Sequence, residues 1–251
     1  HDMTLAKGIS PLGDVFGGDV KGMKIGLPAE FFGEGIDRQV RDAVMAAALK
    51  YKEMGMEIVD VSLPSLKYAV AAYYLIGSAE ASSNLARYDG VKYGYCAENG
   101  DSFDEVLINT RNEGFGTEVK RRILLGTYAL SSGYFDAYYK KASLLRERIK
   151  AEYDAIFEKC DVILTPTAPT TAYKIGTQTD NPAQMYLADI CTVTANIAGL
   201  PAVNTTCGYD QNGLPIGMSL VGKAFDEKTI LNLADRMERS GQHVLNDFMI
   251  D

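Results

Sequence analysis

The periodicity of hydrophobic residues changes twice in the first part of the chain. Short apolar stretches at residues 22–28 (GMKIGLP) and 56–64 (MEIVDVSLP) have the length of β-strands, and the second also alternates apolar and polar positions. Between them the apolar residues keep helical spacing, on a helix that Asp37 can cap and Gly55 can end. The residues of this apolar face are Val40, Val44, Ala47, Ala48, Tyr51 and Met54. A strand, a helix and a strand in this order predict parallel pairing with a right-handed crossover.

Helical spacing dominates the middle of the chain. We expect one helix over about residues 65–88, a loop over residues 90–105 and a long helical region over residues 117–159, with a kink or break at residues 131–133 (SSG). The spacing of the apolar residues in the long region predicts that it packs along one face. These residues are Phe135, Tyr138, Tyr139, Ala142, Leu145, Ile149, Tyr153 and Ile156.

Residues 160–173, CDVILTPTAPTTAY, begin as a buried strand (DVIL) and then become small, hydroxyl-bearing and proline-rich. Pro166 and Pro169 restrict the backbone conformation of the segment that leaves this strand, called the exit below, and neither has a backbone N–H to donate. Because ligands collect at the carboxyl ends of strands in a parallel α/β sheet, the exit is expected to line the mouth of a pocket. A plain rigid connection between a strand and a helix explains the same residues equally well.

Two segments are predicted from residues that typically interrupt, begin or end regular secondary structure. The glycine-rich residues 1–21 show no sustained period, which predicts an irregular arm or linker. A helix is predicted over residues 183–198, because Asn181 can cap it, Pro182 suits its first turn and Gly199 can end it.

The end of the chain predicts two strands and a helix. The strands occupy residues 202–208 and 213–222. Asp226 can cap the helix, and Phe225 and Ile230 are placed to form a hydrophobic staple. Strands and helices thus alternate through the chain, which predicts the α/β class with a mixed, largely parallel sheet covered by helices.

Composition narrows the class of protein. The 251 residues are 47% hydrophobic, which is enough for a substantial core, and the net charge of −8 disfavours direct binding of nucleic acid. The four cysteines, Cys96, Cys160, Cys191 and Cys207, are scattered and form no CxxC pair, so we expect reduced core residues and no structural metal site. No apolar run reaches the roughly 20 residues that span a bilayer, so we expect a cytoplasmic protein without membrane contact.

Candidate catalytic residues are few. The histidines are His1 and His243, which leaves little for a Ser-His-Asp or Cys-His site. No phosphate-binding glycine motif occurs. The serine pairs at residues 82–83 and 131–132 lie in helical surroundings and lack the flanking glycines of a nucleophile elbow. The residues alone therefore show no complete catalytic apparatus.

Four long blocks of the sequence carry a resemblance to a known family. They resemble the C-terminal half of proteins of the amidase signature family, in particular the glutaminase subunits of tRNA-dependent amidotransferases. The likeness runs from about residue 19 to the end. The blocks are residues 73–95, 113–142, 160–173 and 185–231. The resemblance implies that residues 22–251 are the C-terminal half of a single amidase signature domain.

The same resemblance implies an activity and partners. Such subunits release ammonia from glutamine for a B subunit, which binds ATP and Mg²⁺ and amidates Glu-tRNA(Gln), while a small C subunit holds the other two together. This chain would need no cofactor and would meet tRNA only through the B subunit. The family's Ser, cis-Ser, Lys triad belongs to a Gly/Ser-rich signature in the N-terminal half, and this sequence has no such stretch. We therefore expect no catalytic residue in this chain.

Three residues match the positions at which these glutaminases hold glutamine: Tyr73 in AAYYLIG, Arg122 in EVKRRILLG and Asp189 in MYLADICT. An arginine suits the α-carboxylate of glutamine, and an aspartate suits its α-ammonium group. Taken alone, Arg122 would be interpreted as a solvated helix charge, Asp189 as a carboxylate with a structural partner and Tyr73 as a core residue. Tyr74 fits the family position as well as Tyr73 does.

Two other functions stay open from the sequence. The first is an amidase signature hydrolase of a different amide, which would show apolar residues where Arg122 and Asp189 stand. The second is a docking module for partner subunits without chemistry of its own, since half of a divided domain leaves a sheet edge and an apolar face exposed.

Overall fold

The computed structural model divides the chain into two compact units. It describes residues 6–9, 12–177 and 188–242. Unit 1 consists of His1–Val70 and Arg148–Asp251, and unit 2 consists of Ala71–Glu147. That residues 22–251 form one half of a single domain stays a prediction.

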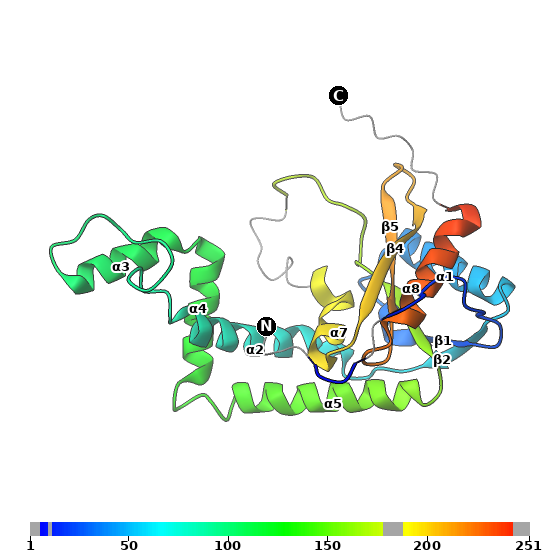
Figure 1. The fold of residues 1–251 in the computed structure, drawn as a ribbon, viewed down its shortest axis with the longest axis horizontal. Helices are drawn as coiled ribbons and strands as arrows, with labels where there is room; N and C mark the ends of the chain where they lie inside the picture. The colour runs from blue at the N-terminus through cyan, green and yellow to red at the C-terminus, as the bar shows by residue number, and fades with distance from the viewer. Residues whose placement is uncertain (1–5, 10–11, 178–187, 243–251) are drawn as a thin grey trace. The chain divides into compact units, whose positions relative to one another are not determined.

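A five-stranded sheet forms the centre of unit 1 (Figure 1). Its order is β2-β1-β3-β5-β4, with β1 parallel to β2 and β3, and β5 antiparallel to β3 and β4. Four of these strands therefore share one direction and β5 opposes them, which confirms the mixed, largely parallel sheet. The strands are β1 (Lys24–Pro28), β2 (Glu57–Val61), β3 (Val162–Pro166), β4 (Ala202–Tyr209) and β5 (Pro215–Val221).

Helices α1 (Arg38–Glu53) and α8 (Glu227–Met237) pack on the same core as the strands (Figure 1). Asp37 caps α1 as predicted, because its Oδ1 accepts the backbone N–H of Gln39 at 2.7 Å. The predicted apolar face of α1 is buried from Val40 to Tyr51. The core from the strands and α8 comprises Ile25, Leu27, Val162, Leu164, Cys207, Ile216, Met218, Leu220, Ile230, Leu233, Ala234 and Met237.

Two details of unit 1 differ from the prediction. The segment expected to be one helix contains a 3₁₀ turn, η2 (Ala188–Cys191), followed by the short helix α7 (Val193–Ala198). Thr192 between them is a turn residue whose side chain does not cap α7, and Gly199 ends α7 at φ 69°. The proposed capping residues, Asn181 and Pro182, lie outside the described residues. The staple at α8 is also wrong, because Phe225 remains 62% exposed.

Unit 2 is helical, and one of its helices was not predicted. Its elements come from α2 (Leu66–Leu85), α3 (Phe103–Gly114), α4 (Thr117–Leu130) and α5 (Tyr139–Phe157), of which α2 and α5 also extend into unit 1. The expected loop over residues 90–105 ends early, because Ser102 caps α3 by accepting the N–H of Glu105 at 3.3 Å. Glu105 in turn accepts the N–H of Asp101 at 2.8 Å. This polar cap starts α3, whose apolar residues are exposed or half-buried.

The break predicted at residues 131–133 is confirmed, and turns continue to residue 138. Phe135 and Tyr138 lie in these turns and are 40% and 39% exposed, so they do not share a buried helical face. Within α5, Ala142, Ile149 and Tyr153 are buried as expected.

A glycine brings α4 close to α2. A Cβ at Gly126 would lie 2.0 Å from the carbonyl oxygen of Ser78 and 2.7 Å from Cβ of Ser82. Ser82 Oγ lies 2.9 Å from Thr127 Oγ1 across the same contact. The absence of a side chain at Gly126 therefore sets the helix spacing.

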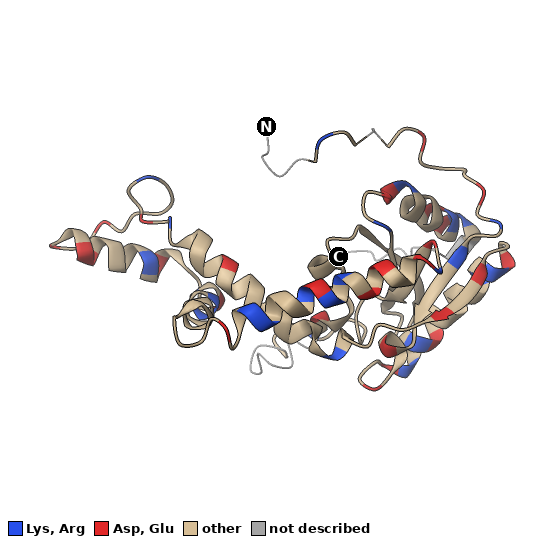
Figure 2. Cartoon of the chain, turned by 90° about the horizontal axis from the view of Figure 1, so that it is seen from below, with Lys and Arg blue, Asp and Glu red and all other residues tan. Residues whose placement is uncertain are grey.

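Charged residues of both signs are interspersed along the helices (Figure 2). Several pairs lie four residues apart, such as Lys140 with Asp136 and Lys150 with Asp154, and neutralise each other locally. Among the described residues, no helix has the length and apolar character that crossing a membrane requires.

Candidate functional site

The exit of β3 is tied to its neighbouring strands by polar side chains. Thr167 donates its backbone N–H to the carbonyl of Gly217 at 3.1 Å, and its Oγ1 lies 3.0 Å from Ser219 Oγ. Ser219 Oγ lies 2.7 Å from Asn204 Oδ1. Thr165 Oγ1 is buried on β3 without a hydrogen-bond partner among the described residues. A row of polar groups thus crosses β3, β5 and β4.

A cavity of about 640 Å³ lies beyond the ends of β1 and β3, which are parallel neighbours. Residues 168–173 contribute to its lining, which confirms the prediction that the exit of β3 borders a pocket. The lining residues are Glu30, Phe31, Glu34, Gly35, Ile36, Leu66, Ala168, Pro169, Thr170, Thr171, Ala172, Tyr173, Ala188 and Ile190. The position at the carboxyl ends of parallel strands is the usual place for a ligand in an α/β sheet.

Hydrogen bonds hold this exit on two sides. Asp37 donates its N–H to the carbonyl of Pro169 at 2.9 Å, so the start of α1 fixes the middle of the loop. Thr171 Oγ1 donates to Asp210 Oδ2 at 2.9 Å, which joins the loop to the connection between β4 and β5. The loop is therefore both a rigid connection and a cavity wall.

Carboxylates contribute the charge of the cavity wall, since its described lining contains Glu30 and Glu34 but no Lys or Arg. Glu30 accepts hydrogen bonds from Ser62 Oγ at 2.5 Å and Leu63 N at 2.9 Å. Burial raises the pKa of the Glu30 carboxyl, but these hydrogen bonds outweigh burial and bring the pKa below its usual value. Glu30 is therefore ionised at neutral pH, and the wall disfavours an anionic group.

Asp189 lies at the border of this cavity in unit 1. It is half-buried in η2, and its chain neighbours Ala188 and Ile190 both line the cavity. Its backbone carbonyl accepts the N–H of Thr192 at 2.9 Å and the Thr192 hydroxyl at 3.1 Å, which fixes the turn.

Arg122 lies on α4 in unit 2 and is held by neighbouring side chains. Its Nε donates to Oε1 of Glu118 at 3.0 Å, and Arg121 bonds the other carboxylate oxygen of the same residue. The guanidinium carbon lies 5.2 Å from the centroid of the Tyr74 ring. The interpretation of Arg122 as a purely solvated charge does not fit these contacts.

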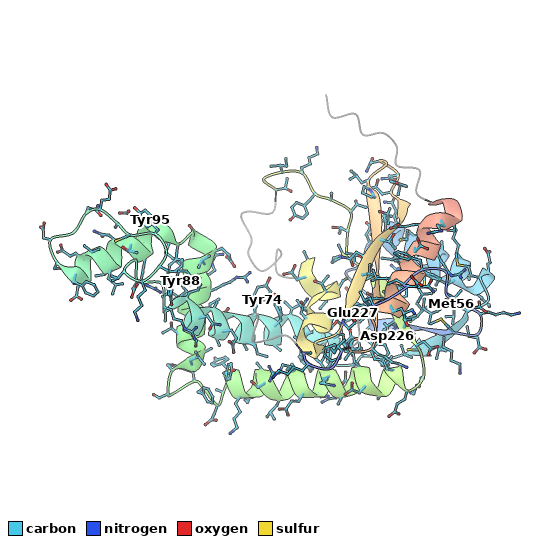
Figure 3. All side chains as sticks on the ribbon, viewed as in Figure 1. Met56, Tyr74, Tyr88, Tyr95, Asp226 and Glu227 are labelled. Carbon is cyan, nitrogen blue, oxygen red and sulfur yellow. The ribbon has the colours of Figure 1, made fainter. Side chains whose placement is uncertain are left out.

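The two adjacent tyrosines of α2 have different positions relative to Arg122. Tyr74, labelled in Figure 3, contacts the guanidinium directly, and Tyr73 packs edge-to-face on Tyr74 with centroids 5.3 Å apart. Both side chains are half-buried. The geometry therefore favours Tyr74 as the partner of Arg122, while Tyr73 as the substrate tyrosine stays a prediction.

The three predicted residues divide between the units. Tyr73 and Arg122 belong to unit 2, and Asp189 belongs to unit 1, so their joint role as a glutamine site stays a prediction. Glu118 was not predicted from the sequence. Its spacing of four residues before Arg122 on one helix is a signal that could have identified it.

One serine of each pair noted in the sequence makes a side-chain hydrogen bond. Ser82 bonds Thr127, and Ser131 Oγ donates to the carbonyl of Tyr128 at 2.8 Å. The described part of the chain contains no group of three or more His, Cys, Asp or Glu residues placed to hold a metal ion.

Comparison with known proteins identifies relatives over most of the chain. The sequence profile of the Amidase family matches residues 14–231. The chain is 56% identical over 223 residues to the A subunit of glutamyl-tRNA(Gln) amidotransferase from Brevibacillus brevis, covering 89% of this chain and 46% of that protein. It is 55% identical over 222 residues to the protein of the same name from Caldanaerobacter subterraneus, covering 88% of this chain and 45% of that protein.

A solved structure agrees with these relatives. The crystal structure of the A subunit of glutamyl-tRNA(Gln) amidotransferase from Thermotoga maritima matches with a TM-score of 0.66 at 37% identity. The match covers 88% of this chain and 43% of that one. The chain therefore spans less than half the length of the relatives it matches.

Proposed function

Because this chain belongs to the amidase family, we propose that it is the glutamine-recognising half of a glutaminase, the A subunit of a glutamyl-tRNA(Gln) amidotransferase. The observation that carries the proposal is the 56% identity to the Brevibacillus brevis relative over 89% of the chain. In this proposal the parent protein hydrolyses the side-chain amide of glutamine, and the ammonia is used to convert Glu-tRNA(Gln) to Gln-tRNA(Gln).

The partners of the proposed glutaminase follow from its role. Ammonia passes to a B subunit that binds ATP, Mg²⁺ and tRNA, and a C subunit joins the two in a cytoplasmic heterotrimer. The net charge of −8 supports a protein that leaves tRNA contact to its partner. The nucleophilic serine and its lysine belong to the preceding half of the parent.

The contribution of this chain is binding. Arg122 takes the α-carboxylate of glutamine through paired N–H bonds, and Asp189 takes the α-ammonium group. A tyrosine of α2, Tyr73 or Tyr74, supplies an aromatic wall. Both charged groups recognise a free amino acid, which separates this proposal from hydrolysis of an apolar amide.

A full-length chimera tests the proposal, with the preceding half of the Brevibacillus brevis relative fused ahead of residue 14 of this chain. We expect ammonia release from glutamine, and a KM raised about 100-fold by Arg122→Ala, because a charge-assisted paired contact is lost. Asp189→Asn should raise the KM about tenfold or more for the same reason.

Two glutamine analogues serve as controls for these variants. Arg122→Ala should hardly affect hydrolysis of 4-aminobutanamide, which lacks the α-carboxylate, and Asp189→Asn should hardly affect glutaramic acid, which lacks the α-amino group. A folded chimera that hydrolyses other amides but not glutamine would identify a different amide hydrolase. A folded chimera without any amidase activity would favour a docking module.

A further inference from the structure

Glu118 joins two arginines of α4 through one carboxylate. Its Oε1 accepts from Arg122 Nε at 3.0 Å, and its Oε2 accepts from Nη1 of Arg121. The three side chains are 35–41% exposed, so the pairs are partly shielded from water. One carboxylate thus restrains two guanidinium groups on the same helix.

Tyr74 confines the same guanidinium from another direction. The guanidinium carbon lies 5.2 Å from the ring centroid, within the range of a cation–π contact. Tyr73 packs edge-to-face on the Tyr74 ring, which restrains that ring in turn. Arg122 is therefore held by a hydrogen bond at Nε and by contact with an aromatic ring.

We propose that Glu118 and Tyr74 are positioning residues that orient Arg122 for the α-carboxylate of the substrate; this inference rests on the proposed function. A free arginine side chain loses rotamer entropy when it fixes a ligand, and a side chain already held by neighbours loses less. With Nε bonded to Glu118, a substrate carboxylate takes the two terminal nitrogens in the paired geometry that guanidinium favours.

The test uses the full-length chimera and two substrates. Glu118→Gln and Glu118→Ala should raise the KM for glutamine about tenfold, with kcat changed less than about twofold, because the loss concerns orientation for binding. Neither variant should change the KM for 4-aminobutanamide, which has no α-carboxylate. Glu118→Asp should recover part of the affinity for glutamine.

Matched controls come from the same helices. Arg121→Ala removes the second partner of Glu118 and should raise the KM for glutamine less than about threefold. Tyr74→Leu should raise it more than Tyr74→Phe, since the phenylalanine keeps the aromatic ring that contacts the guanidinium. Circular dichroism and the thermal midpoint verify that each variant is folded.

The outcomes separate this inference from the proposed function. If Arg122→Ala impairs glutamine hydrolysis selectively but neither Glu118 variant does, the inference is wrong and the proposed function stands. Equal effects of the Glu118 variants on both substrates would assign Glu118 a purely structural role and also overturn the inference. If Arg122→Ala affects both substrates equally, the proposed role of Arg122 itself is wrong.

Discussion

Unit 1 buries isoleucine, leucine, valine, tyrosine and phenylalanine side chains, whereas the buried apolar residues that the structure describes in unit 2 are all alanines. In unit 2 these are Ala72, Ala79, Ala97, Ala129 and Ala142. Burial of a large apolar side chain contributes about 1.5–3 kcal/mol, and an alanine contributes far less. The difference teaches that the sheet unit is stabilised by its own core, whereas the helical unit depends on other contacts.

Those other contacts in unit 2 are close backbone approach and polar bonds. Gly126 lets α4 approach Ser78 of α2, and Arg111 donates Nη1 to the carbonyls of Leu85 and Tyr88, both at 3.0 Å, at the end of α2. Such bonds contribute about 1 kcal/mol each. Unit 2, which carries Arg122, is therefore expected to open locally more readily than unit 1.

The largest expected contrast comes from the same substitution in each unit. Leu164→Ala on β3 should lower the free energy of unfolding by about 4 kcal/mol, because Leu164 is completely buried. Leu124→Ala on α4 should change it by no more than about 0.5 kcal/mol, because Leu124 is 71% exposed. Urea unfolding followed by circular dichroism measures both. Equal losses would contradict the contrast between the units.

The next effect concerns the helix contact of unit 2. Gly126→Ala should cost about 3 kcal/mol locally, because the added methyl group would overlap the Ser78 carbonyl and force α2 and α4 apart. Amide hydrogen exchange in α2 and α4 should accelerate, while exchange in β3 stays slow. Gly77→Ala is the matched control on α2, since nothing lies within 4 Å of its added Cβ. That change should stabilise the helix by about 0.5–1 kcal/mol.

The smallest expected effect on stability concerns the hydrogen bonds that the ionisable Glu30 carboxyl accepts in unit 1. Glu30→Gln should lower stability at pH 7 by about 1 kcal/mol, because hydrogen bonds from Ser62 and Leu63 favour the ionised carboxylate. The pKa of Glu30 is lowered by folding, so this stability is present above the usual value of 4.5 and is lost as pH falls through the lower folded pKa. Unfolding curves of the two proteins should converge in acid. A difference independent of pH would rule out this linkage.

The two units also differed in how far the sequence predicted them. In unit 1 the periodic apolar residues of α1 and the strands coincide with the core. The periodicity of hydrophobic residues therefore predicted the helix, the strands and their order along the chain. In unit 2, the apolar residues of α3 end at Ile108 and are exposed or half-buried, so the pattern is too short to predict the whole helix. Its start at Ser102 is marked only by a polar cap.

The candidate site shows the same limit. The residues of the loop after β3 were sufficient to predict that it lines a pocket. The contribution of Glu30 and Phe31 could not be predicted in this way, because it depends on β1 lying beside β3. Arg122 was singled out through the family resemblance alone, since its run of basic neighbours is typical of a solvated helix. Its contact with Tyr74 joins residues far apart in sequence and required the fold.

The distribution of the thiols makes this chain convenient to label. Burial raises the pKa of the Cys160 thiol to about 11 and the pKa values of Cys191 and Cys207 to about 12, so these three thiols of unit 1 react slowly in the folded protein. Cys96 in unit 2 is exposed. A maleimide dye at neutral pH should therefore mark Cys96 alone, and it would report the local mobility of the segment before α3 without any cysteine being removed.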